Sequence, residues 1–125
     1  MNIIILNSSS EPIYEQIIKQ IKNYIFDGTL REGELLPSIR SLAKELGISV
    51  ITTKRAYEEL ERENFIETVP GRGSYVAVQN KELLREKKIK VIEDKLLEAI
   101  DESKAVNLSV EDLKEMLEVL YEDNK

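Results

Sequence analysis

Residues Leu36 to Leu60 read L-P-S-I-R-S-L-A-K-E-L-G-I-S-V-I-T-T-K-R-A-Y-E-E-L, which predicts two helices joined by a tight turn. Ser38 follows a proline and can cap the first helix through its hydroxyl. Gly47 ends that helix, because glycine accepts the left-handed conformation of a C-terminal cap. Ser49 can cap the second helix. This is the pattern of a helix-turn-helix, whose second helix can lie in the major groove of DNA.

Apolar spacing assigns an inward face to each of these two helices. In the first helix that face is formed at three- and four-residue steps by Ile39, Leu42, Ala43 and Leu46. In the second helix the inward stripe is assigned to Ile48, Thr52, Ala56 and Leu60, with Tyr57 beside it. The first two turns then expose Val50, Ile51, Thr53, Lys54 and Arg55. The alternative is that Val50 or Ile51 belongs to the core.

Further elements are predicted on both sides of this motif. Residues 13–26 indicate an amphipathic helix, because isoleucines recur at four-residue steps. After Asn64 two strand-like runs, 65–69 and 74–78, flank Pro70-Gly71-Arg72-Gly73, which favours a hairpin. A hairpin directly after such a helix is the wing of a winged-helix domain. Met1 to Leu6 is expected to form another short strand, for which the sequence identifies no partner.

The segment from Asn80 to Lys125 predicts two amphipathic helices. The first has an apolar face of Ile89, Ile92, Leu96 and Ile100. After a break at 104–108, Ser109 to Asp112 forms a capping signature, and the second helix repeats Leu113, Met116, Leu117 and Leu120. Two such helices can cover each other only partly, so we expect a second copy of the chain to cover the rest. The alternative is a monomer whose tail folds back on its own winged helix.

Composition narrows the class of function. The 125 residues include no cysteine and no histidine, so thiolate metal sites and the commonest general base are missing. We therefore expect no enzyme, metal or cofactor. The run Ile3 to Leu6 is too short to span a bilayer and lacks the features of a signal peptide, which predicts a cytoplasmic protein with no membrane partner.

The net charge of the chain is −6, but four basic side chains face one acidic side chain between Ser38 and Arg55. DNA would meet this local patch, since salt screens distant charges.

Several motifs in order resemble the DNA-binding domain of the GntR family of bacterial transcription regulators. They are P-I-Y-E-Q-I from Pro12, the stretch from Leu36 to Ser49, A-Y-E-E-L-E-R-E-N-F-I-E-T from Ala56, and G-R-G-S-Y-V-A from Gly71. The match covers roughly residues 10 to 78, and the short tail is similar to the YtrA-type subfamily. Family members often carry Arg or Asn near Val50 and Ile51, so the operator sequence is not predicted. The resemblance implies a DNA contact for Arg40, transporter operons as targets, and a small-molecule effector that no residue identifies and that only a pocket between subunits could hold.

The chemistry of the exposed side chains assigns the remaining DNA contacts. The hydroxyls of Ser38 and Ser49 can contact phosphate in addition to capping, and Val50 or Ile51 can pack on a thymine methyl. Thr52, Thr53, Lys54 and Arg55 can reach phosphates or base edges, although Arg55 can instead pair with Glu58 or Glu59. At the hairpin tip, Gly71 and Gly73 let Arg72 approach a minor groove or a phosphate, whereas a plain turn with a solvated arginine is the alternative.

The sequence thus predicts a mainly α protein with a small β hairpin. Residues 1–79 would form a winged helix-turn-helix DNA-binding domain, and residues 80–125 a helical dimerisation tail. The predicted function is a transcription regulator, most simply a repressor, that binds a palindromic double-stranded DNA operator as a homodimer. A protein-interaction module that uses the winged helix only as a scaffold is the alternative.

Overall fold

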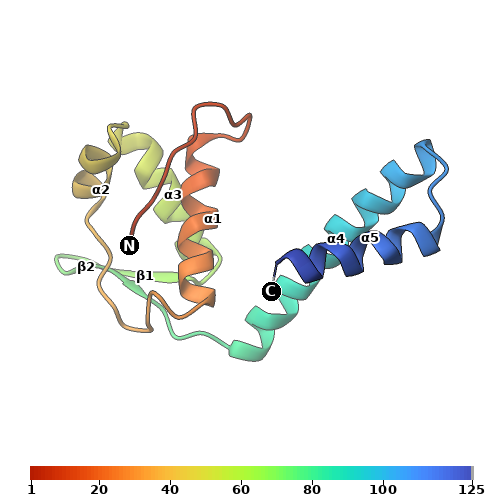
Figure 1. The fold of residues 1–125 in the computed structure, drawn as a ribbon. Helices are drawn as coiled ribbons and strands as arrows, with labels where there is room; N and C mark the ends of the chain where they lie inside the picture. The colour runs from red at the N-terminus through yellow and green to blue at the C-terminus, as the bar shows by residue number, and fades with distance from the viewer. Residues whose placement is uncertain (125) are drawn as a thin grey trace. The chain divides into compact units, whose positions relative to one another are not determined.

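The structure is a computed structural model that describes Met1 to Asn124, and it divides into two compact units (Figure 1). The first unit is Met1–Asn80 and the second begins at Lys81. Five helices and one two-stranded antiparallel sheet make up the described part of the chain, which is mainly α with a small hairpin, as predicted. None of the helices in this part is both long and apolar enough to cross a membrane.

The core of the first unit lies between α1 (Ile13–Phe26) and α3 (Val50–Arg62) (Figure 1). Ile17 and Ile21 of α1 are completely buried, as is Leu60 of α3. The short helix α2 (Ile39–Leu46) packs against α3 from another side. Helix α3 is therefore packed against both of these helices, and only part of its surface remains open to solvent.

The predicted helix caps are confirmed. Ser38 Oγ accepts a hydrogen bond from Ser41 N at 3.0 Å, and Ser49 Oγ accepts one from Thr52 N at 3.1 Å. Gly47 adopts a left-handed φ of +69° and closes α2. Ser49 therefore caps the first turn of α3, the turn that carries Val50 and Ile51.

The inward stripe predicted for α3 is wrong by one position. Thr53 is fully buried while Thr52 is half-buried, and the buried face consists of Thr53, Ala56, Tyr57 and Leu60. The predicted stripe followed strict four-residue steps from Ile48, but a helix has 3.6 residues per turn, so Thr53, three residues before Ala56, also falls on the inward face. Here the Thr53 hydroxyl donates to Ser49 O at 3.1 Å, so its burial leaves no polar atom unpaired.

The wing consists of β1 (Ile66–Val69) and β2 (Gly73–Val76), paired from Ile66 opposite Val76 to Val69 opposite Gly73. The segment before α2 extends this hairpin, because Leu35 pairs with Tyr75 and Leu36 N donates to Ser74 O at 2.9 Å. The wing and the entry to α2 are therefore joined by backbone hydrogen bonds.

The segment Met1 to Leu6 is not a strand, contrary to expectation. Its backbone is paired with side-chain amides of α1 instead of with another strand. Gln20 Oε1 accepts from Ile4 N and its Nε2 donates to Ile4 O, both at 2.8 Å. Gln16 Oε1 accepts from Leu6 N at 2.9 Å, and Ile3 is buried. A glutamine side chain carries the same donor and acceptor groups as a peptide, so two of them replace the missing partner strand.

The second unit consists of α4 (Lys81–Ala105) and α5 (Val110–Asp123), which run antiparallel (Figure 1). The predicted break is confirmed, and Leu108 N donates to Ser103 O across it at 3.0 Å. The predicted capping box is also present: Asp112 N donates to Ser109 Oγ at 3.1 Å, and Ser109 N donates to Asp112 Oδ2 at 2.9 Å. The hydrogen bonds from Ser109 lower the pKa of the Asp112 carboxyl.

Removing the amide of Gln16 tests the pairing of the N-terminal segment. Gln16→Leu leaves the part-buried Leu6 N–H without its acceptor, so we expect the free energy of unfolding to fall by ~1–3 kcal/mol. Hydrogen exchange should accelerate at Leu6 more than at Ile4. Gln20→Leu is the matched control, and it should accelerate Ile4 instead. Equal exchange at both amides in the two variants would contradict this pairing.

Candidate nucleic-acid interface

The first turn of α3 presents its apolar side chains to solvent. Val50 is 49% exposed and Ile51 is 78% exposed. Neither side chain belongs to the core, so the alternative that placed one of them there is wrong. Two neighbouring β-branched side chains on the open end of a helix form a surface that can contact thymine methyl groups in a major groove.

An open hollow of about 500 Å³ lies between α2 and the start of α3. Arg40, Ser41 and Lys44 line it from α2, and Val50 lines it from α3. Two cations four residues apart on one helix, beside an apolar wall, suit an anionic ligand that also carries an apolar edge. The sequence predicted Arg40 as a contact and counted Lys44 only in the local basic patch, although the four-residue spacing between them places both on one face of the helix.

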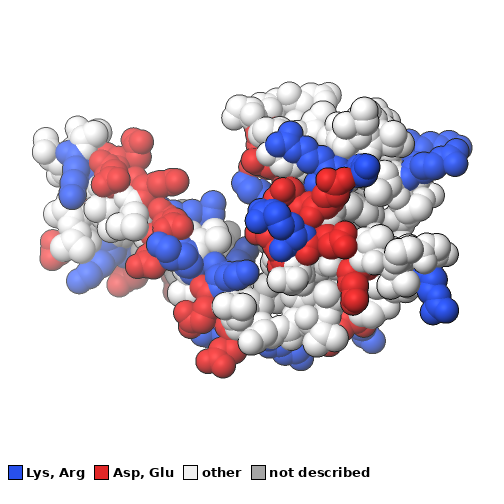
Figure 2. Space-filling view, turned by 180° about the vertical axis from the view of Figure 1, so that it is seen from behind, with Lys and Arg blue, Asp and Glu red and all other residues white. Residues whose placement is uncertain are grey.

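The cations that follow on α3 have acidic neighbours. Lys54 Nζ lies 3.7 Å from Glu58 Oε1, with both side chains exposed. Arg62 donates to Glu59 Oε2 at 2.7 Å, and this bond lowers the pKa of the Glu59 carboxyl. On the face seen in Figure 2, basic and acidic side chains are likewise interspersed. Exposed ion pairs of this kind are weak, so Lys54 can exchange Glu58 for another anion at little cost.

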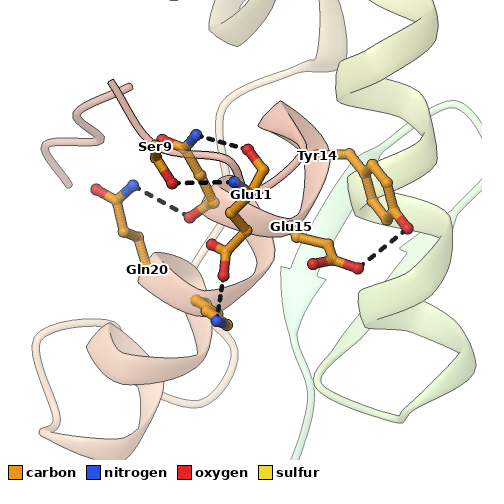
Figure 3. A network of polar contacts seen from close by, with 7 residues as sticks. Ser9, Glu11, Tyr14, Glu15 and Gln20 are labelled. Carbon is orange, nitrogen blue, oxygen red and sulfur yellow. Dashed lines mark hydrogen bonds and ion pairs between the residues drawn. The ribbon is translucent and has the colours of Figure 1, made fainter. Parts of the chain in front are cut away.

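Arg55 does not form the ion pair with Glu58 or Glu59 that was considered as its alternative. Its Cζ lies 3.8 Å from the centre of the Tyr14 ring, which comes from α1. The Tyr14 hydroxyl donates to Glu15 Oε1 at 3.2 Å (Figure 3). Sequence reasoning missed Tyr14, because the packing of α1 on α3 joins two residues that are distant in the chain.

Thr53 cannot take the contact predicted for it. Its side chain is fully buried and its hydroxyl is bound to Ser49 O. Thr52 is half-buried, and its hydroxyl lies 3.0 Å from Ser49 Oγ. The prediction for Thr53 is therefore wrong, whereas the Thr52 and Ser49 hydroxyls lie together at the open end of α3.

The hairpin tip carries Arg72 on a tight turn. Gly71 has a φ of +78°, and Arg72 N donates to Val69 O at 2.9 Å. A proline followed by a left-handed glycine is typical of a type II turn. Gly73 has a φ of +116°, which strains any residue with a side chain, and an added Cβ would lie a tight 3.1 Å from Leu35 Cδ1. Arg72 is exposed at this tip, where its side chain is free to reach outward.

Tyr57 links α3 to the segment before α2. Its side chain is buried, and its hydroxyl donates to Pro37 O at 2.7 Å. Burial raises the pKa of the Tyr57 phenol. This hydrogen bond adds to the packing of α2 on α3 in holding the two helices together.

The apolar stripe predicted for the tail lies largely in solvent. Seven of its eight residues are between 38% and 53% exposed: Ile89, Ile92, Leu96, Ile100, Met116, Leu117 and Leu120. Leu113 is half-buried, and α4 and α5 make few contacts with each other. The two helices of one copy therefore leave much of their apolar surface uncovered.

Among the described residues, no cluster of three or more His, Cys, Asp or Glu is arranged to hold a metal ion.

Known proteins are similar to this chain in both sequence and architecture. Residues 13–76 match the model of the bacterial regulatory proteins of the gntR family. The transcriptional repressor YtrA of Bacillus subtilis is 39% identical, over 94% of this chain and 90% of its own length. A transcriptional antiterminator from Listeria monocytogenes has a crystal structure that covers 98% of this chain and 92% of its own, with 35% identity and a TM-score of 0.75. YtrA from Sulfolobus acidocaldarius, a GntR-family transcription factor, covers 72% and 96%, with 38% identity and a TM-score of 0.59. The chain therefore belongs to the GntR family of bacterial regulatory proteins and is of the YtrA type.

Proposed function

We propose that this transcription regulator is a homodimeric repressor that binds a two-fold symmetric operator. The exposed first turn of α3, beside the basic hollow of α2, is the observation that carries the proposal. Its B. subtilis relative is named a transcriptional repressor and covers nearly the whole chain. Occupying an operator would block access of the transcription machinery to the promoter.

In this proposal the start of α3 enters the major groove. Val50 and Ile51 pack on thymine methyl groups, while Lys54 exchanges its exposed partner Glu58 for a phosphate or a base edge. Arg40 and the hydroxyls at Ser38 and Ser49 contact the backbone, which positions the helix. Thr52 and Arg55 complete the contacts of α3, and Thr53 takes no part.

The wing contacts the neighbouring groove through its tip. Gly71 and Gly73 bring the backbone close to DNA, and Arg72 reaches into the minor groove or to a phosphate. The hydrogen bonds between the wing and the segment before α2 hold the tip in a fixed relation to Arg40.

The tail brings two copies together. An apolar stripe that lies in solvent on both α4 and α5 gains free energy when a second copy covers it. A closed two-fold dimer satisfies both copies at once. Two recognition helices related by that symmetry would read half-sites spaced by about one turn of DNA or a multiple of it. The cytoplasmic location, the transporter operons and the small-molecule effector stay predictions.

Selection of bound duplexes from a random pool tests this function directly. We expect an enriched palindrome and an affinity that falls steeply with salt, because phosphate contacts release counterions. The acidic net charge of −6 favours the alternative of a protein-interaction module, which would barely bind duplex DNA. A pool without enrichment would reject the proposed function.

The proposed contacts of Arg40 and Lys54 can be tested on the selected duplex. Arg40→Ala and Lys54→Ala should each weaken binding by ~1–3 kcal/mol if the side chain reaches a base edge. Thr53→Val is the control, and it should bind as the wild type does, since that hydroxyl is buried. Wild-type affinity in both alanine variants, measured by fluorescence anisotropy, would reject this assignment of the contacts.

The dimer is tested by placing a charge in the stripe. Leu117→Asp should shift the sedimentation coefficient towards that of a monomer, because burying a carboxylate in an apolar interface is costly. Lys114→Glu adds negative charge beside the stripe and should leave the dimer intact. A sedimentation coefficient unchanged by Leu117→Asp would place this residue outside the interface.

A further inference from the structure

The spacing along α3 places two carboxylates where either could form an ion pair with Arg55. Glu58 and Glu59 follow it by three and four residues, the spacing at which side chains on a helix surface meet. The hydrogen bond from Arg62 is the main cause of the lowered pKa of the Glu59 carboxyl, and the positive charge of Arg55 lowers that pKa further. An arginine held by such a carboxylate has fewer N–H groups to offer a second anion.

In the structure, Arg55 contacts a side chain of α1 instead of these carboxylates. The Arg55 guanidinium stacks over Tyr14, with Cζ 3.8 Å from the ring centre, and Glu59 is bound by Arg62 instead. The Arg55 side chain is exposed, and its guanidinium donates no hydrogen bond to any residue that the structure describes. Stacking engages the face of the guanidinium, whereas its N–H donors point outward in the plane.

The ring is itself held in place. Tyr14 is half-buried on α1, and its hydroxyl donates to Glu15 Oε1 at 3.2 Å (Figure 3). Helix α1 packs on α3 through the main core of the unit, so the ring has a fixed position relative to the recognition helix. A rigid ring that holds a flexible cation reduces the conformational entropy that Arg55 loses on binding.

We propose that Tyr14 is a positioning residue for DNA binding: its ring holds the Arg55 guanidinium away from Glu58 and Glu59 and orients it towards a phosphate beside the major groove. This inference rests on the proposed function, because it assigns Arg55 a phosphate contact. Tyr14 acts through Arg55 and needs no contact with DNA of its own. A stacked guanidinium with free N–H donors is well suited to the fork geometry of phosphate recognition.

A double-mutant cycle on the duplex recovered by selection tests the proposal. Tyr14→Leu removes the ring, and we expect affinity to fall by about two- to fivefold, the range of an exposed cation–π contact. Arg55→Ala should weaken binding and reduce the salt slope by about 0.9 for each phosphate that the arginine neutralises in the wild type. In the Arg55→Ala background, Tyr14→Leu should have no further effect on affinity or on the slope.

Two variants separate positioning from a general structural role. Tyr14→Phe keeps the ring and the packing of α1 on α3 that places it, and loses only the hydrogen bond to Glu15, so it should retain most of the wild-type affinity. Glu59→Gln removes a competing carboxylate and should restore part of the affinity that Tyr14→Leu loses. Thermal unfolding of each full-length variant checks that the winged unit stays folded at the temperature of the assay.

The outcomes distinguish this inference from the function on which it rests. If Arg40→Ala weakens binding while the Tyr14 and Arg55 variants match the wild type, the positioning role is overturned and the proposed function stands. Equal losses from Tyr14→Leu with and without Arg55 would also overturn the positioning role. If the wild type binds no duplex, the proposed function itself fails.

Discussion

The structure depends on the burial of one face of α3 against α1. Thr53, Ala56, Tyr57 and Leu60 turn inward, and the isoleucines of α1 close over them. Since a helix has a fixed period, burying this face determines which side chains are left outside. Val50, Ile51 and Lys54 face solvent because their neighbours are held in the core. Ser49 contributes by capping the first turn, so loss of that cap would fray the end of α3 that carries Val50 and Ile51.

An acidic protein can still bind an acidic polymer when charge is arranged locally. The net charge of −6 is spread over the chain. Near the open end of α3, in contrast, Arg40 and Lys44 lie on α2 and Lys54 lies on α3 itself. Salt screens the more distant carboxylates over ~8–10 Å. The acidic side chains on α3 then act less as a barrier than as exchangeable partners, because exposed ion pairs of the Lys54–Glu58 kind are weak.

Local signals predicted most of the fold, and contacts between distant segments were missed. Caps and the hairpin turn are encoded within a few residues, so Ser38, Gly47 and the capping box of the tail were found from sequence. The face of α3 was misassigned by one position, because Thr53 is buried through a hydrogen bond to Ser49 O that composition does not reveal. The N-terminal segment looked like a strand because its β-branched residues suit one, yet its backbone pairs with glutamine side chains. The stacking of Arg55 on Tyr14 depends on how α1 packs on α3, and no pattern along the chain reports it.

In the proposed function, the open end of α3 is the surface that contacts DNA. NMR amide chemical shifts of the full-length protein, recorded as a selected duplex is added, locate this surface. We expect the largest shifts at residues 49–55, at Arg40 and at 71–73, with small shifts along the buried side of α1. Shifts confined to α4 and α5, with the start of α3 unperturbed, would contradict this proposal.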